Sequence, residues 1–243
     1  MATMISFIVP AHNEEAWIGK CLASIRSTME KLAEPYEVIV VDDASTDSTH
    51  RIAKQLGART LRVEHRKISA VRNAGAQVAG GEKFFFVDAD TQVNERAVSA
   101  ALAALRAGAV GGGCLIDLEG PAPMWARIIL FFAILVARLL RWACGCFVFC
   151  TREAYAATGG FSETMYAGED LAFIQALKKV GRFVVLKPNV VTSGRKLDVA
   201  GPWDVIKLAL TIALRGPHYE SKWVLDILYG RRAQDCRKSV KAA

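Results

Sequence analysis

Short, mostly apolar runs alternate with longer amphipathic stretches through the first half of the chain. Runs without regular polar alternation are typical of strands that are buried on both faces of a sheet. The predicted strands are Ile5–Val9, Val38–Val41, a strand marked by Leu61 and Val63, and Phe84–Val87. Strands separated by helical stretches predict an α/β fold with a mainly parallel central sheet and helices on both faces.

Apolar residues recur at helical spacing between these strands. One helix face is predicted from residues three and four apart, namely Ile18, Leu22, Ile25, Met29 and Leu32. Asn13 is the expected N-cap of that helix, and Glu14 and Glu15 suit its positive start. Three further helices are marked by Ile52 and Leu56, by Ile68, Val71 and Val78, and by Ala97–Leu105.

The second half of the chain breaks this rhythm. The elements predicted there are a glycine-rich strand over Val110–Ile116, a helix over 124–143, a strand over Phe147–Phe149, a turn at Gly159–Phe161, a helix that opens at Glu169–Asp170, a strand over Phe183–Leu186 and a helix over Trp203–Leu214. No internal repeat or biased linker divides the chain. We therefore expect one domain over residues 1–230, with halves 1–113 and 114–230, and a basic tail over 231–243.

Composition and charge narrow the class of protein. Of 243 residues, 52% are hydrophobic and 23% charged, which excludes disorder for most of the chain. The net charge of +7 suits a solvated basic tail or attraction to anionic lipid. No nucleic-acid-binding signature accompanies it, so we expect no nucleic-acid partner. The spacing of the six cysteines completes no zinc pattern and favours buried thiols in a reduced compartment.

Membrane-spanning and secretory signals are not found in the sequence. The apolar run Ile128–Ala137 is too short for a bilayer, which needs about 20 residues. The first residues carry no signal-peptide pattern. A cytoplasmic location is therefore expected, with peripheral contact to the cytoplasmic face of the membrane as the alternative.

Polar residues follow three of the predicted strands. They are His12–Asn13, Asp42–Asp43 and Asp88–Asp90. Ligands bind beyond the carboxyl ends of the strands in parallel sheets, so these residues should share one crevice. Asp88 and Asp90 could hold Mg²⁺ or Mn²⁺ through carboxylate oxygens, or could simply be polar turn residues.

Three other groups have both a structural and a chemical interpretation. Asp42–Asp43 could cap a helix or accept a hydrogen bond from a nucleobase or ribose. Arg72 could lie on an exposed basic helix or pair with a phosphate. Glu169–Asp170 could offset a helix dipole or supply a general base for an acceptor hydroxyl.

Six motifs in this order resemble the family 2 glycosyltransferases of GT-A fold. They are FIVPAHNEE, VIVVDDASTD, ISAVRNAG, FFFVDAD, TGGFSE and GEDLAF, and they run from Phe7 to Phe173. The resemblance implies a Rossmann-like nucleotide-binding sandwich. It also implies inverting transfer of a sugar from a nucleoside-diphosphate donor such as a UDP- or GDP-sugar.

The same resemblance assigns roles to individual residues. Asp43 would recognise the base, Arg72 the nucleotide or diphosphate, and Asp88 the ribose or sugar. Metal binding falls to Asp90 and the role of catalytic base to Asp170. The nucleotide pocket would be shaped by Pro10, Ala11, Asn13 and Glu15.

The chain also departs from the family pattern. The stretch Val191–Lys196 has neither a His nor a QxxRW element. The resemblance therefore supplies no third protein ligand for the metal, and elongation of a long polysaccharide is not expected. Arg195 or Lys196 would be alternative contacts for the diphosphate.

The acceptor side leaves alternatives open. The apolar segments Trp125–Trp142 and Trp203–Leu214 could pack on the sheet or in a homodimer, or could lie in a membrane interface beside a lipid-linked acceptor. A catalytically inactive nucleotide-binding partner subunit at a membrane is the alternative function. A nucleotidyltransferase is disfavoured because no glycine-rich, basic phosphate loop follows the first strand.

Overall fold

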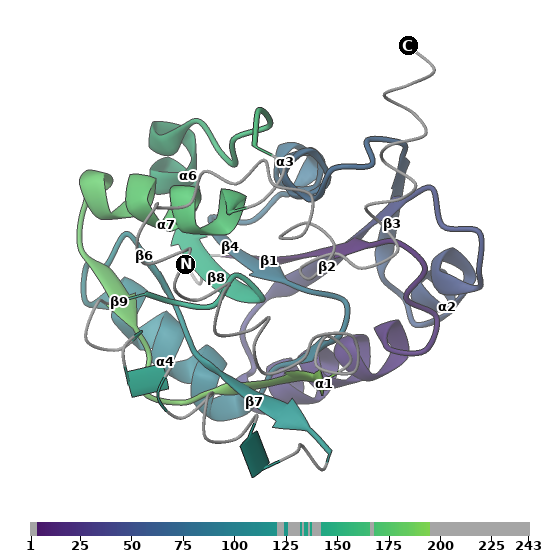
Figure 1. Cartoon of the computed structure of the whole chain (residues 1–243), viewed down its shortest axis with the longest axis horizontal. Coiled ribbons are helices and arrows are strands. Elements are labelled where there is room, and N and C mark those ends of the chain that lie inside the picture. The colour runs from purple at the N-terminus through teal and green to yellow at the C-terminus, as the bar shows by residue number, and fades with distance from the viewer. Residues whose placement is uncertain are drawn as a thin grey trace.

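The protein is built on a seven-stranded central sheet (Figure 1). The computed structural model describes residues 4–120, 124–125, 132, 134–135, 137, 142–165 and 168–194. In spatial order the strands are β3 (Arg59–Val63), β2 (Tyr36–Asp43), β1 (Ile5–Ala11), β4 (Lys83–Val87), β8 (Phe147–Thr151), β6 (Gly111–Gly113) and β9 (Phe183–Val185). Only β8 runs antiparallel to its neighbours, so the prediction of a mainly parallel sheet is confirmed for the described residues.

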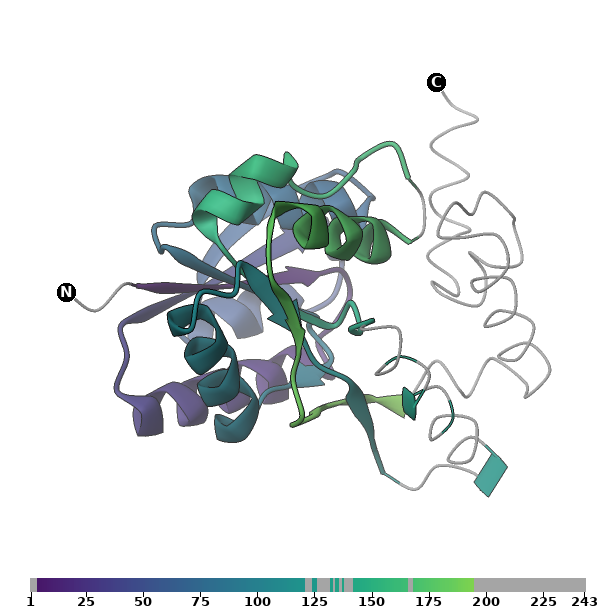
Figure 2. The ribbon, with the colours of Figure 1, turned by 90° about the vertical axis from the view of Figure 1, so that its left-hand side faces the viewer.

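Helices cover both faces of this sheet (Figure 2). One face carries α1 (Ile18–Leu32), α2 (Thr49–Gln55) and α4 (Glu95–Arg106), and the other carries α3 (Ile68–Val78), α6 (Arg152–Thr158) and α7 (Glu169–Val180). Successive side chains of a strand point to opposite faces. Phe7 and Val9 of β1 accordingly pack in the first layer and Ile8 in the second, all fully buried.

A second, smaller sheet lies beside the first, and it corrects one prediction. Its strands, in order, are β5 (Thr91–Gln92), β10 (Val190–Ser193) and β7 (Ile116–Glu119). The single strand expected over Val110–Ile116 is wrong, because β6 ends at Gly113 and the chain then enters the smaller sheet as β7. A run of glycines has no side-chain pattern that could mark such a change of sheet.

Two local predictions also need correction. Asn13 does not cap α1, which begins at Ile18 after Trp17 and has no acidic residue in its first turn. Asn13 instead takes a left-handed backbone conformation, with φ of 53°, in the loop before the helix. Helix α6 was not expected, although Thr151 caps it by accepting a hydrogen bond from the Ala154 N–H at 3.1 Å.

The apolar segments of the acceptor side are only partly described. Within the helix predicted over 124–143, the described residues up to 137 are helical, and Trp142 and Ala143 are not. The helix predicted over Trp203–Leu214 and the tail over 231–243 lie outside the described residues. In the part of the chain that the structure describes, no helix combines the length and apolar character needed to cross a bilayer.

Candidate active site

The residues predicted to share a crevice follow the carboxyl ends of β1, β2 and β4, and β1 lies between the other two strands in the sheet. Ala11 pairs with Asp42 at the end of the parallel register between β1 and β2. Pro10 and Ala11 are buried at the end of β1. The structure thus brings the ends of these three strands together, as the sequence predicts.

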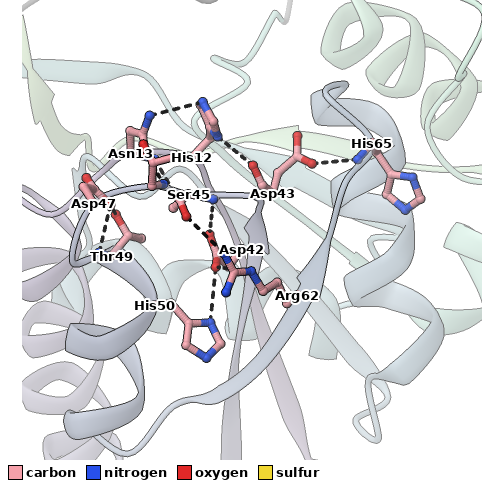
Figure 3. A network of polar contacts seen from close by, with 11 residues as sticks. His12, Asn13, Asp42, Asp43, Ser45, Asp47, Thr49, His50, Arg62 and His65 are labelled. Atoms are coloured by element: carbon pink, nitrogen blue, oxygen red, sulfur yellow. Dashed lines mark hydrogen bonds and ion pairs between the residues drawn. The ribbon is translucent and has the colours of Figure 1, made fainter. Parts of the chain in front are cut away.

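The loops after β1 and β2 are joined by hydrogen bonds (Figure 3). The Asn13 N–H donates to Ser45 Oγ at 3.0 Å, and the Thr46 N–H donates to Asn13 Oδ1 at 2.8 Å. Glu15, two residues later, makes a similar pair of hydrogen bonds. Its N–H donates to Asp47 Oδ2, and its Oε2 accepts from the Ser48 N–H at 2.9 Å. Asn13 and Glu15 therefore fix the geometry of the loop pair.

The two aspartates that end β2 have different surroundings. Asp42 is fully buried, accepts the Ser45 N–H at 3.0 Å and lies 3.2 Å from His50 Nδ1. Asp43 holds the loop before α3, because its Oδ1 accepts the N–H groups of His65 and Arg66 at 2.7 and 3.1 Å. Asp42 is therefore a structural residue of the turn, and Asp43, which is also buried, joins the end of β2 to the loop before α3.

Arg72 is a buried cation between two acids. Its residue is 2% exposed, which excludes the exposed basic helix considered from the sequence. The Nη2 atom donates to Asp88 Oδ1 at 2.9 Å and to the Gly145 carbonyl at 3.2 Å, and Nη1 donates to Glu169 Oε1 at 3.1 Å. The guanidinium also lies 5.1 Å from the centroid of the Phe161 ring.

Asp170 lies next to this buried cluster. Burial acts to lower the pKa of Arg72, but the charges of Asp88, Glu169 and Asp170 raise it above its usual value, so the guanidinium stays charged. Asp170 is half-buried at the start of α7, and its side chain contacts Gly145 so closely that a Cβ atom on that glycine would lie 2.7 Å from the Asp170 Cβ. Asp88 and Asp170, which are far apart in the sequence, therefore both lie close to Arg72.

Asp90 lies at the other side of the β4 end. It is 7% exposed, and its Oδ2 accepts the Ser193 hydroxyl at 2.7 Å. Ser193 belongs to the stretch in which the family pattern would place a His. The sequence did not predict three of these contacts, namely those of Ser193 with Asp90, of Glu169 with Arg72 and of Gly145 with Arg72. The acid pair Glu169–Asp170 was a signal for the second, and the glycine between two cysteines was a signal for the third.

Three carboxylates, those of Asp90, Asp88 and Glu14, lie near the Cys21 thiol. Burial raises the pKa of the Cys21 thiol, and the neighbouring charges of Asp90, Asp88 and Glu14 raise it further. Among the described residues, no group of three or more His, Cys, Asp or Glu side chains forms a complete metal site. A cation such as Mg²⁺ usually takes most of its ligands from substrate phosphates and water, so it needs few carboxylates from the protein.

Comparison with known sequences identifies the family. Residues 6–154 match the family described as glycosyl transferase family 2. The chain is 37% identical over 102 residues, 39% of its length, to the poly(ribitol-phosphate) beta-glucosyltransferase of Bacillus spizizenii. It is 31% identical over 100 residues, 37% of its length, to the undecaprenyl-phosphate 4-deoxy-4-formamido-L-arabinose transferase of Aeromonas hydrophila. These matches span 16% and 29% of the two relatives, so the chain corresponds to a minor part of each.

Comparison with solved structures confirms the GT-A fold. A mannosyltransferase from Pyrobaculum calidifontis in complex with GDP-Man and Mn²⁺ has a TM-score of 0.64 and 20% identity, with 100% of this chain and 76% of that chain covered. S. aureus TarS 1–349 in complex with UDP-GlcNAc has a TM-score of 0.61 and 19% identity, with 94% and 72% covered. Because the family match spans more than half of the chain, this protein belongs to glycosyltransferase family 2.

Proposed function

We propose that this chain is an inverting, metal-dependent glycosyltransferase that moves a sugar from a UDP- or GDP-sugar to an acceptor hydroxyl or phosphate. One observation carries the proposal: a buried arginine joins Asp88, at the end of β4, to the acid that precedes Asp170. A mere nucleotide-binding partner subunit would not need these acids in one cluster, and nothing observed supports that alternative.

The donor would lie over the carboxyl ends of β1 and β2. Asp43 would recognise the base, and the joined loops with Pro10, Ala11, Asn13 and Glu15 would shape the nucleotide pocket. The solved relatives that hold GDP-Man and UDP-GlcNAc support a nucleotide-sugar donor. Asp88 would contact the ribose or sugar at the end of β4.

Asp90 would hold Mg²⁺ or Mn²⁺. A bound cation supplies charge stabilisation for the departing diphosphate, worth several kcal/mol in metal-assisted transfer. The Pyrobaculum calidifontis mannosyltransferase, which holds Mn²⁺, supports the use of a divalent metal.

Asp170 would act as the general base. The acceptor oxygen attacks the anomeric carbon, and Asp170 takes the proton of the acceptor hydroxyl. The bond from the anomeric carbon to the diphosphate oxygen breaks, and its electron pair leaves with the nucleoside diphosphate. A single displacement of this kind inverts the anomeric configuration.

A lipid-linked acceptor at a membrane surface is the finer form of this proposal. Met124, Phe132 and Leu135 are apolar side chains that are 73%, 59% and 57% exposed on the acceptor side, and the chain carries a net charge of +7. The Aeromonas hydrophila relative is named for an undecaprenyl-phosphate substrate. Co-sedimentation with anionic liposomes at low salt, reversed by added salt, is the expected behaviour, and a homodimer through the same segments is the competing result.

Thermal stability in the presence of nucleotides tests the donor and metal sites together. UDP, GDP and their sugars are added with and without Mn²⁺ to the natural protein, to Asp90→Ala and to the control Asp117→Ala, whose exposed carboxylate bonds only to Asn189 among the contacts described. A ligand at 100 times its Kd stabilises by about 2.7 kcal/mol. We expect one nucleotide class to stabilise the natural protein and the control with metal, and Asp90→Ala not to respond. Stabilisation by none of them would contradict the proposal.

A further inference from the structure

We infer that Arg72 is a positioning residue for the Asp170 base and not a ligand of the donor diphosphate. This inference rests on the proposed glycosyl transfer, and it changes the role that the family resemblance suggests for Arg72.

The Arg72 guanidinium faces protein rather than solvent. Its side chain is 3% exposed, and both Nη atoms donate to protein oxygens within 3.2 Å. The ring of Phe161 covers one face of the group at 5.1 Å. The Nε atom has no hydrogen-bond partner among the described residues, but it is buried as well. A phosphate that bound the two Nη atoms would have to displace Asp88 or Glu169 from its ion pair, which would leave a carboxylate at the site without its cation.

Two of the Arg72 partners adjoin Asp170 directly. Glu169 precedes Asp170 in the first turn of α7, and its ion pair with Arg72 fixes that turn, where Gly168 provides no side-chain cap. Gly145 accepts from Arg72 through its carbonyl and contacts the Asp170 carboxylate through its Cα side. One guanidinium therefore holds both the residue before the base and the residue that faces it.

The neighbouring residue, Asn73, binds the main chain of Phe161, which lies in the stretch between α6 and α7. Its Oδ1 accepts the Phe161 N–H at 2.9 Å, and its Nδ2 donates to the Phe161 carbonyl at 2.9 Å. The Phe161 ring stacks on Phe173 of α7 with centroids 4.0 Å apart. Arg72 and Asn73 thus connect α3 to both the loop before α7 and the start of α7, which carries Asp170.

The first measurement separates positioning from donor binding. The probe is the UDP- or GDP-sugar that stabilises the protein best, with Mn²⁺ present. The slow transfer of its sugar to water gives a kcat although the natural acceptor is not known. We expect Arg72→Lys, which keeps the charge but cannot reach all three oxygens, to lower kcat about 10- to 100-fold, as small misplacements of a reacting group do. The Kd of the nucleoside diphosphate, measured by calorimetry, should change less than threefold.

Arg152→Lys is the matched control. Arg152 also lies over a ring, 4.8 Å from the Phe84 centroid, and it also donates to main-chain carbonyls, but at the opposite end of β4. Its substitution should leave kcat and Kd unchanged once each variant is corrected for its folded fraction. A tenfold or larger rise in Kd for Arg72→Lys, or an unchanged kcat, would overturn the inference.

A double-mutant cycle with Asp170→Asn distinguishes the inference from the proposed function. If Arg72 acts through Asp170, Arg72→Lys should lower kcat by less than threefold in the Asp170→Asn background, because no base remains to be positioned. A full additional loss in that background would overturn the inference and leave the proposed function intact. An unchanged hydrolysis rate in Asp170→Asn alone would show that Asp170 is not the general base, and the inference would then fail together with that part of the proposed function.

Discussion

Arg72 and Arg152 lie at opposite ends of β4, and the two ends differ in what these arginines bind. Arg152 follows β8 at the amino end of β4, and its guanidinium donates to the main-chain carbonyls of Ala79 and Gly81. Arg72, at the carboxyl end, donates to Asp88 and Glu169 as well as to a carbonyl. Both guanidinium groups lie about 5 Å from a phenyl ring, but Arg72 is buried and Arg152 is only half-buried.

The difference shows where the molecule retains charge at a cost. Burying two carboxylates and a guanidinium requires desolvation of all three, and an apolar cluster of similar volume is often as stable. Neutral carbonyl acceptors satisfy Arg152 without that cost. A buried charge cluster is therefore weak evidence for stability, and its location at the carboxyl end, where ligands bind in such sheets, points to chemistry.

The largest expected effect comes from the acid beside the Arg72 cluster. Asp170→Asn should lower turnover by at least about 100-fold, because a general base contributes roughly that much or more. Donor affinity and the free energy of unfolding should change little, since Asn keeps the shape of the half-buried side chain. Steady-state kinetics, calorimetry and denaturant unfolding measure the three quantities, with the exposed Asp117→Asn as control. Full turnover in Asp170→Asn would mean that the cluster of Arg72, Asp88 and Glu169 serves the fold and not the reaction.

A smaller effect is expected from closing the space beside that acid. A Cβ atom on Gly145 would overlap the Asp170 carboxylate, so Gly145→Ala should displace the base and lower kcat by about 10-fold or more. The control is Gly19→Ala in α1, where an added Cβ meets no atom within 4 Å. That substitution should leave kcat unchanged and stabilise the helix by about 0.5–1 kcal/mol. Equal activity of both variants would show that the Asp170 position is not critical.

The sequence predicted the parallel half of the sheet well because β1, β4 and the end of β2 are buried on both faces, whereas the edge strand β3 is partly exposed. Strands buried on both faces leave unmistakable apolar runs, and the acids that follow them must lie at one edge. Arg72 shows what such a pattern cannot give. Its partner Glu169 lies 97 positions further along the chain, so the direction of the guanidinium depends on how α3 and α7 pack.

Other elements lacked a local signal or had a misleading one. The glycines of β6 carry no side chains to alternate, so the change of sheet after Gly113 was invisible. Asn13 has the residue type of an N-cap, but its hydrogen bonds go to the loop after β2, which no local rule considers. The acceptor side beyond residue 194 lies outside the described residues, and the predictions made for it stay predictions.

The smallest expected effect concerns an acid of the same edge that stabilises the fold. Burial acts to raise the pKa of Asp47, but hydrogen bonds from the Thr49 side chain and N–H and from the Glu15 N–H outweigh it and lower the pKa below its usual value. A carboxyl group with a lowered pKa in the folded state adds stability above its unfolded pKa of about 4, and this contribution is lost as pH falls through the folded value.

Asp47→Asn should therefore reduce the free energy of unfolding at neutral pH and make it less dependent on pH below about 4. Solvent screening keeps the difference near 0.5 kcal/mol or less, because the side chain is only half-buried. Denaturant unfolding at several pH values between 3 and 7 measures it, with turnover at neutral pH as the second readout. If Asp47→Asn lost turnover but not stability, Asp47 would belong with the acids that serve the reaction. The distinction between acids that serve the reaction and acids that stabilise the fold would then not hold at this edge of the sheet.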